Sequence, residues 1–119
     1  MRKKILIVDD EYSVRTSIED TLREILEEKL KIYTASNGRE ALNILEKEKF
    51  NFIVSDIDMP VMNGFQLLKE LEKINNDSKI IMMSGINRLS EFSKFKNVIG
   101  FLKKPLRLAD LFELADLIT

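Results

Sequence analysis

The chain of 119 residues contains no cysteine and no histidine. The absence of cysteine excludes disulfide bonds and thiol catalysis, and the absence of histidine removes the commonest metal ligand and general base. Any chemistry of this chain must therefore use carboxylates, hydroxyls and lysine. Such groups suit hard cations such as Mg²⁺ and phosphate chemistry rather than zinc chemistry.

The sequence also lacks a charge excess and a long apolar run. Lysine and arginine together number 19 against 20 for aspartate and glutamate, so nothing favours a nucleic-acid partner. The basic start at residues 2–4 is followed by only four apolar residues, Ile5 to Val8, which are too few for a signal peptide or a membrane span. We therefore expect a cytoplasmic protein that binds neither nucleic acid nor membrane directly.

No linker, internal repeat or low-complexity segment divides the sequence. With 45% apolar and 33% charged residues, the composition is that of an ordinary soluble domain. We expect a single domain over residues 1–119, with no output domain in this chain.

Short apolar runs alternate with amphipathic stretches along the whole sequence. The runs predict five strands, at residues 4–8, 31–36, 50–56, 79–85 and 98–105. Apolar residues at helical spacing follow each run, and Ser13 is the expected N-cap of the first helix. The fourth helix is short and runs through Leu89, Phe92 and Phe95. A closing helix is expected from Leu108, Leu111, Phe112, Ala115 and Ile118.

Five strands that each precede a helix predict a parallel sheet, because parallel neighbours need crossover connections. Right-handed crossovers place helices on both faces of such a sheet. We therefore expect an α/β fold, a three-layer doubly wound sandwich in which five helices surround a five-stranded parallel sheet of order 2-1-3-4-5.

Polar side chains stand at the carboxyl ends of the predicted strands. The first strand ends at Asp9 and Asp10, the third at Asp56, the fourth at Ser84 and the fifth at Lys104. In a sheet of order 2-1-3-4-5, ligands bind where the winding direction reverses, between the first and third strands. We expect the three carboxylates to meet there, with the hydroxyl and the ammonium group arriving from the neighbouring strands.

Three carboxylates in one crevice repel one another, and a divalent cation relieves that repulsion. Mg²⁺ (or Mn²⁺) suits a site of one or two carboxylates and a phosphoryl oxygen. A carboxylate can also act as a nucleophile and form an aspartyl-phosphate. We predict that Asp56 is this nucleophile, that Ser84 donates a hydrogen bond to the new phosphoryl group, and that Lys104 pairs with a carboxylate or phosphoryl oxygen.

Four motifs at these strand ends resemble the receiver domain of two-component response regulators, which is chemotaxis-regulator-like and has a flavodoxin-like fold. They are VDDE after the first strand, DIDMPVMNG after the third, MMSG closing the fourth and FLKKP closing the fifth. The resemblance covers essentially the whole chain. It implies that Asp56 is the phosphoacceptor, that Asp9 and Asp10 organise the magnesium ion, and that Asp58 offers its backbone carbonyl to the metal.

The resemblance also implies a conformational switch. Ser84 matches the switch hydroxyl, Phe101 the switch aromatic and Lys104 the family's lysine, which Pro105 follows across a bond that is usually cis. The phosphoryl donor is a sensor histidine kinase or a histidine phosphotransfer protein, which must act in trans because this chain has no histidine. The implied result is a changed face of the fourth helix, fifth strand and fifth helix. That face would meet an unidentified downstream protein, in a monomer or a phosphorylation-dependent dimer.

Two alternatives fit part of the pattern. DIDMP also resembles the DxD motif of haloacid dehalogenase-like phosphatases, with Asp56 as nucleophile and Asp58 as general acid. That family needs a hydroxyl residue where Pro60 stands and an acidic cluster late in the chain, which the sequence lacks after the fourth strand. The other alternative is a pseudo-receiver that only presents a constant binding surface, against which the complete set of acids, hydroxyl and lysine argues. We expect a signalling phosphoacceptor that catalyses only its own phosphorylation and dephosphorylation, not an enzyme.

Overall fold

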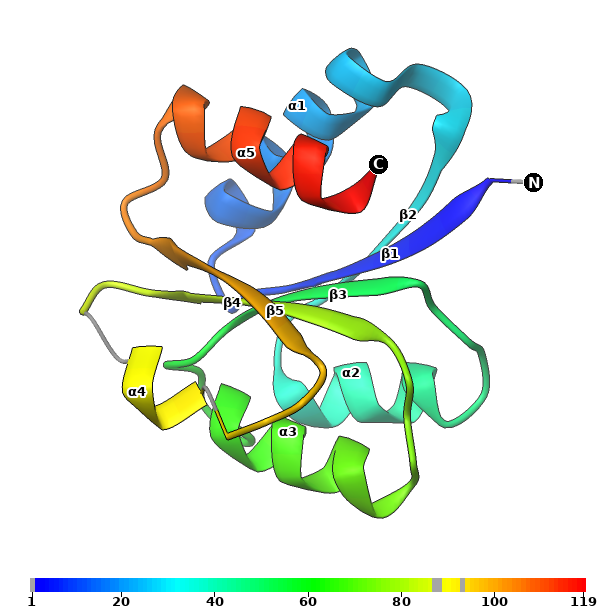
Figure 1. Ribbon diagram of the computed structural model, residues 1–119, viewed down its shortest axis with the longest axis vertical. Coiled ribbons are helices and arrows are strands. Elements are labelled where there is room, and N and C mark those ends of the chain that lie inside the picture. The colour runs from blue at the N-terminus through cyan, green and yellow to red at the C-terminus, as the bar shows by residue number, and fades with distance from the viewer. Residues whose placement is uncertain (1, 87–88, 93) are drawn as a thin grey trace.

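The computed structural model of the chain describes residues 2–86, 89–92 and 94–119. A five-stranded parallel sheet of order β2-β1-β3-β4-β5 forms its centre (Figure 1). The strands are β1 (Lys3–Val8), β2 (Leu30–Ala35), β3 (Phe52–Asp56), β4 (Lys79–Ser84) and β5 (Val98–Lys103). The predicted strand order is confirmed, and no predicted strand end is displaced by more than two residues.

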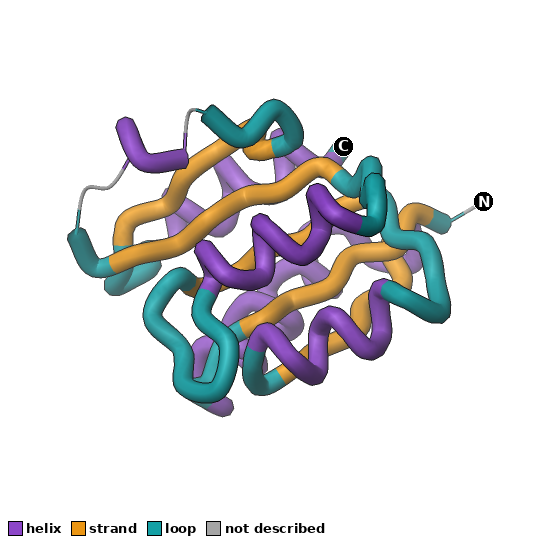
Figure 2. Tube along the Cα trace, turned by 90° about the horizontal axis from the view of Figure 1, so that it is seen from below, coloured by secondary structure: helices purple, strands orange, loops and turns teal. Residues whose placement is uncertain are grey.

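Helices cover both faces of the sheet. They are α1 (Tyr12–Leu26), α2 (Gly38–Leu45), α3 (Gly64–Lys73), α4 (Leu89–Phe92) and α5 (Leu108–Ile118), and the short 3₁₀ turn η1 (Glu27–Lys29) continues α1. α1 and α5 lie on one face, and α2, α3 and α4 lie on the other (Figures 1 and 2). In the described part of the chain, four helices have eight residues or more and α4 is a single turn. The predicted doubly wound sandwich is confirmed.

The two faces of β1 explain its continuous apolar sequence. Successive side chains of a strand point to opposite faces. Leu6 and Val8 pack in the core beneath α2 and α3, whereas Ile5 and Ile7 pack in the core beneath α1 and α5. All four side chains are fully buried, as in a parallel sheet covered by helices on both sides. Asp9 is therefore the first position at which the strand sequence can become acidic.

The helix α1 begins earlier than the capping pattern predicts. The prediction that Ser13 is its N-cap is wrong, because the helix starts at Tyr12 and Glu11 is the N-cap, with φ −95° and ψ 116°. The backbone N–H of Glu11 donates to Oδ1 of Asp9 at 2.9 Å, which turns the chain immediately after β1. The Glu11 carbonyl then accepts the N–H of Arg15 at 3.1 Å, so the first helical turn closes on residue 11.

The helix α5 buries only part of its apolar pattern. Leu111, Ala115 and Ile118 pack in the core, but Leu108 and Phe112 are 61% and 50% exposed. The predicted closing helix is confirmed, with two of its apolar residues exposed. Residues four apart share one helix face, and this face points away from the sheet.

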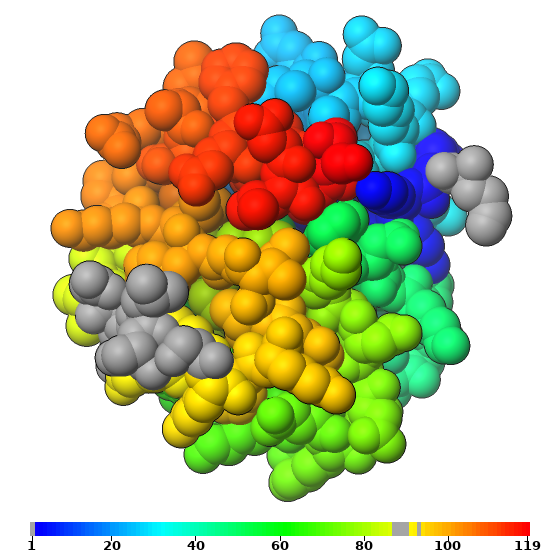
Figure 3. Space-filling view, viewed as in Figure 1, coloured from blue at the N-terminus to red at the C-terminus, as the bar shows by residue number. Residues whose placement is uncertain are grey.

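The strand β5 forms one edge of the sheet. In the space-filling view, its part of the chain (orange) is visible between α5 (orange to red) and α4 (yellow) (Figure 3). Ile99 is accordingly 40% exposed, whereas Phe92 and Phe95 are buried. The prediction that the fourth helix runs through Phe95 is wrong, because α4 ends at Phe92. The side chain of Leu89 lies outside the described part of the structure. None of the helices described is long and apolar enough to cross a membrane.

Candidate functional site

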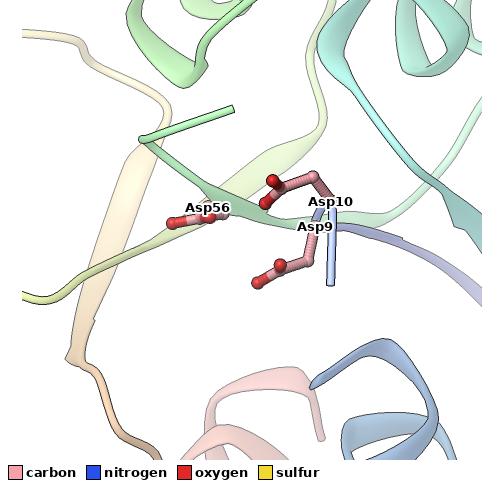
Figure 4. A group of neighbouring side chains, drawn as sticks. All are labelled: Asp9, Asp10 and Asp56. Atoms are coloured by element: carbon pink, nitrogen blue, oxygen red, sulfur yellow. The ribbon is translucent and has the colours of Figure 1, made fainter. Parts of the chain in front are cut away.

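Three carboxylates come together at the carboxyl ends of β1 and β3 (Figure 4). Asp9 and Asp10 follow β1 directly, and Asp56 is the last residue of β3, the strand that pairs with β1. One oxygen of each carboxylate lies within 4.8 Å of the others. Asp9 is 0% and Asp56 3% exposed, whereas Asp10 is exposed. The prediction that the three carboxylates meet is confirmed.

The sheet itself holds the backbone of the two buried acids. The N–H of Asp9 donates to the carbonyl of Ala35 in β2 at 3.1 Å. Directly after Asp56, the N–H of Ile57 donates to the carbonyl of Met83 in β4 at 3.0 Å. The strand ladders therefore extend as far as the acids, and only their side chains are left to face the site.

Lys104 supplies the positive charge of the site. Its Nζ lies 2.9 Å from Oδ2 of Asp9, 3.3 Å from Oδ2 of Asp56 and 3.6 Å from Oε1 of Glu11. The side chain is only 16% exposed. The backbone N–H of Lys104 donates to the carbonyl of Ser84 at 2.8 Å, and the peptide bond to Pro105 is cis. Lys104 follows β5 and thus reaches the carboxylates from the β3 side of the site rather than from the β1 side, as predicted.

The environment of Asp56 disfavours its charged form. Burial and the nearby negative charge of Asp9 raise the pKa of the Asp56 carboxyl from 3.8 to about 6. The ammonium of Lys104 and a hydrogen bond from the backbone of Asp58 lower this pKa but do not compensate fully. For Lys104, burial lowers the pKa, yet its contacts with Asp9 and Asp56 outweigh burial and raise the pKa overall. The lysine therefore stays charged at neutral pH.

The donor set fits a hard divalent cation. Three carboxylates share one ammonium group, so negative charge is in excess at the site. Burial, and after it the charge of Asp9, raise the pKa of Asp56 accordingly. All ligands on offer are oxygens, which Mg²⁺ and Mn²⁺ prefer over the nitrogen and sulfur ligands typical of zinc. Asp9, Asp10 and Asp56 could hold such an ion.

An open cavity of 860 Å³ lies beside the carboxylates. Asp10, Asp56, Asp58 and Lys104 are among the residues that line it, whereas Asp9 is not. A ligand in this cavity would therefore reach Asp56 directly. Asp58 is exposed at its rim, and the role of its backbone carbonyl as a metal ligand stays a prediction.

Ser84 ends β4 at the predicted place. Its side chain is 0% exposed, and its Oγ accepts a hydrogen bond of 3.2 Å from the backbone N–H of Ile86. The next residue, Gly85, lines the cavity, and a Cβ added there would meet no atom within 4 Å. The site therefore has open space beside the serine.

Phe101 belongs to a chain of three aromatic rings. Its ring centroid lies 5.9 Å from that of Phe92, and Phe92 stacks on Phe65 at 4.7 Å. Phe101 is partly buried, whereas Phe92 is fully buried. The rings connect β5, α4 and α3, so a change in the position of Phe101 would alter its packing against α4.

Sequence reasoning assigned no role to two residues near the site. Glu11 contacts Lys104, and Arg15 donates from Nη1 to the backbone carbonyl of Asp9 at 2.6 Å. The contact between Glu11 and Lys104 could have been expected from the sequence, because Glu11 directly follows the Asp9–Asp10 pair. No sequence pattern indicates the second, because it depends on how the first turn of α1 folds back on β1.

Comparisons with known proteins agree with this geometry. The chain matches the family described as "Response regulator receiver domain" over residues 5–116. It is similar to sporulation initiation phosphotransferase F of Bacillus subtilis, with 30% identity over 116 residues that cover 98% of this chain and 90% of that protein. It is 39% identical to the probable transcriptional regulator ycf27 of Cyanophora paradoxa, over 76% of this chain but only 36% of that regulator.

Solved structures give the same result. The chemotaxis response regulator CheY4 of Vibrio cholerae is similar over 100% of both chains, with a TM-score of 0.85 and 29% identity. The response regulator protein TrrA of Thermotoga maritima, solved in complex with Mg²⁺-BeF, has a TM-score of 0.79 and 28% identity over 98% of this chain and 99% of that one. Sequence and structure thus converge over almost the entire chain.

Proposed function

The chain belongs to the response regulator receiver domain family of two-component systems, and on that premise we propose that Asp56 is its phosphoacceptor. The observation that carries this proposal is the position of the Asp56 carboxylate, which lies between the acidic pair and Lys104 and lines the open cavity. An oxygen of Asp56 attacks the phosphorus, the bond from phosphorus to the donor breaks, and an acyl phosphate forms on Asp56.

The other two acids suit this role less well. Asp9 does not line the cavity, its Oδ1 accepts the N–H of Glu11, and its Oδ2 contacts Lys104 at 2.9 Å. Asp10 is exposed, and among the described residues Lys104 forms its ion pairs with Asp9, Glu11 and Asp56 instead. The surroundings therefore favour Asp56 as nucleophile and the other two as metal ligands.

Asp9, Asp10 and Asp56 would hold Mg²⁺ or Mn²⁺, with the backbone carbonyl of Asp58 as a further ligand. When bound, the ion neutralises negative charge on the oxygens of the phosphoryl group in transfer. This chain's own residues would do the remaining work. Lys104 pairs with a phosphoryl oxygen, and Ser84 donates its hydroxyl proton to another.

Phosphorylation would switch the protein through Ser84 and Phe101. A serine drawn toward the phosphoryl group leaves space beside β5, and Phe101 turns into that space. The ring contact from Phe101 to Phe92 transmits the change to α4. The altered face of α4, β5 and α5 would bind a downstream protein, whether as a monomer or as a phosphorylation-dependent dimer.

The phosphoryl donor would be a sensor histidine kinase or a histidine phosphotransfer protein in the cytoplasm. Residues 1–119 would act as a single receiver domain without direct contact with nucleic acid or membrane. The domain is a signalling phosphoacceptor, whose only catalysis would be its own phosphorylation and dephosphorylation. No observation on the described residues favours a phosphatase, since Pro60 occupies the position where the haloacid dehalogenase motif needs a hydroxyl.

Intact mass spectrometry tests this function. The protein and the variant Asp56→Asn are incubated with acetyl phosphate and Mg²⁺, and again with EDTA in place of Mg²⁺. We expect one phosphoryl adduct, on the unmodified chain only and in the presence of Mg²⁺ only. An adduct on Asp56→Asn would assign phosphorylation to another residue, and no adduct on either protein would support a pseudo-receiver.

A further inference from the structure

Glu11 is a third acidic partner of Lys104 that the phosphoacceptor chemistry above does not use. Its Oε1 lies 3.6 Å from the lysine Nζ, beyond the two closer contacts to Asp9 and Asp56. Unlike those two acids, Glu11 keeps a side chain that is 60% exposed. The ammonium of Lys104 therefore contacts two buried carboxylates and one solvent-exposed carboxylate.

The backbone fixes Glu11 at the rim of the cavity. Its N–H donates to Asp9 Oδ1 at 2.9 Å, and its carbonyl accepts the N–H of Arg15 at 3.1 Å. Glu11 also lines the same cavity as Asp56. A phosphodonor that reaches Asp56 through this cavity therefore reacts in a space that the Glu11 carboxylate also lines.

Resting on the proposed function of Asp56, we infer that Glu11 determines phosphodonor specificity. Its fixed negative charge favours donors in which the phosphoryl group is attached to a positively charged nitrogen. It disfavours donors that release an anion. The chemical class selected in this way is the phosphoramidates, to which a protonated phosphohistidine belongs.

The two donor classes differ in the charge of the leaving group. In phosphoramidate, H₃N⁺–PO₃²⁻, the P–N bond breaks with its electron pair going to nitrogen, and neutral NH₃ leaves while Asp56 gains the phosphoryl group. In acetyl phosphate, the bond from phosphorus to the bridging oxygen breaks, and acetate leaves with a negative charge. A nearby carboxylate attracts the cationic nitrogen and repels the developing acetate, and this effect weakens as salt is added.

Glu11 also competes for Lys104. An ammonium that is shared with Glu11 is less available to the phosphoryl oxygens of a dianionic donor. For acetyl phosphate, the repulsion of the leaving acetate and the competition for Lys104 both slow the reaction with Asp56. For phosphoramidate, the attraction of the cationic nitrogen and the competition for Lys104 oppose each other, so removing Glu11 changes its rate less.

The experiment measures the second-order rate constant of phosphorylation by mass spectrometry, with acetyl phosphate and with phosphoramidate, at low salt and saturating Mg²⁺. For Glu11→Gln we expect the acetyl phosphate rate to rise about threefold to tenfold and the phosphoramidate rate to stay level or fall. The preference for phosphoramidate then drops by at least about threefold, and 0.5 M KCl removes most of the difference. Glu11→Asp, which keeps the charge, retains the original preference.

The matched control is Glu24→Gln, since Glu24 is an exposed glutamate on α1, the helix that Glu11 caps, about 20 Å farther along the chain. It should leave both rates unchanged. Equal changes with both donors, or no change in Glu11→Gln, would overturn the inference. So would a loss of Mg²⁺ affinity in Glu11→Gln, measured by calorimetry without any phosphodonor, because Glu11 would then act through the metal. If the unmodified protein forms no adduct on Asp56 with either donor, the proposed function fails instead.

Discussion

The backbone N–H of Gly38 donates a hydrogen bond of 3.1 Å to the carbonyl of Met62. This bond ties the first residue of α2 to the loop between β3 and α3, the loop that begins directly after Asp56. A Cβ at residue 38 would lie 2.5 Å from that carbonyl oxygen and 2.8 Å from Cγ of Met62. Only glycine allows the two segments to approach so closely.

We therefore expect Gly38→Ala to lower the free energy of unfolding by about 1–3 kcal/mol, because the methyl group forces the loop and helix apart. Urea denaturation followed by circular dichroism measures this change. The control is Gly85→Ala, where a Cβ meets no atom within 4 Å, and its stability should stay within about 0.5 kcal/mol. Equal stability of Gly38→Ala and the original protein would show that the loop can shift at no cost.

The raised pKa of Asp56 makes stability depend on pH. The pKa of the Asp56 carboxyl is about 6 in the folded chain, whereas an unperturbed aspartate, as in the unfolded chain, has a pKa of 3.8. The folded state therefore binds the proton more tightly than the unfolded state. The stabilisation from protonated Asp56 is complete below about pH 4 and disappears as the pH rises through 6, a loss of about 2–3 kcal/mol. Asp56→Asn should lack this dependence and should be the more stable protein at pH 7.5 without divalent cations.

Urea titrations between pH 4 and pH 8 in EDTA test this prediction. The difference in unfolding free energy between Asp56→Asn and the original chain should grow with pH over this range. A difference that is constant across the range would mean that Asp56 is not forced toward its neutral form.

Mg²⁺ should stabilise the folded chain, because the unfolded chain does not bring the three acids together. At a concentration one hundred times its dissociation constant, the gain is about 2.7 kcal/mol. Asp10→Asn removes an exposed ligand and should weaken Mg²⁺ binding at least tenfold, which lowers that gain by about 1.4 kcal/mol. Calorimetric titration and thermal unfolding measure both effects. The control is Asp20→Asn, since Asp20 is an exposed aspartate on α1 away from the site. This variant should bind Mg²⁺ as the original protein does. An equal loss of Mg²⁺ affinity in Asp20→Asn would contradict a local site.

Val61 occupies a strained backbone position. Its φ is 70°, and the N–H of Met62 donates to the carbonyl of Pro60 at 2.8 Å, so Val61 is the central residue of a tight γ-turn. A β-branched residue is an outlier at positive φ, whereas asparagine is several-fold enriched among the non-glycine residues that adopt it. The valine side chain is 78% exposed and loses little burial when replaced.

We expect Val61→Asn to raise the free energy of unfolding by about 0.5–1.5 kcal/mol in urea denaturation. Val61→Thr provides the comparison, since it keeps the branched Cβ and adds a polar atom, and it should give no such gain. Destabilisation by asparagine would show that the valine makes a contact that outweighs its backbone strain.

The sequence was sufficient for the strands, their order and the position of the acids, because β1 and β3 are buried apolar runs that end where the first acidic residue occurs. Asp9 and Asp56 mark such ends. The start of α1 was not predictable in the same way, since it depends on the hydrogen bond from Glu11 to Asp9 rather than on a capping residue type. The orientation of Leu108 and Phe112 was missed because an apolar residue on a helix does not reveal whether its face meets the sheet or the solvent.

The hydrogen bond from the N–H of Lys104 to the carbonyl of Ser84 has a mechanical consequence. It joins the ends of β4 and β5 at the two residues that carry the hydroxyl and the ammonium group. Separating them would break a largely buried backbone bond at a cost of about 1–3 kcal/mol. The two residues are therefore coupled, and a displacement of the serine is passed through this backbone bond to the lysine.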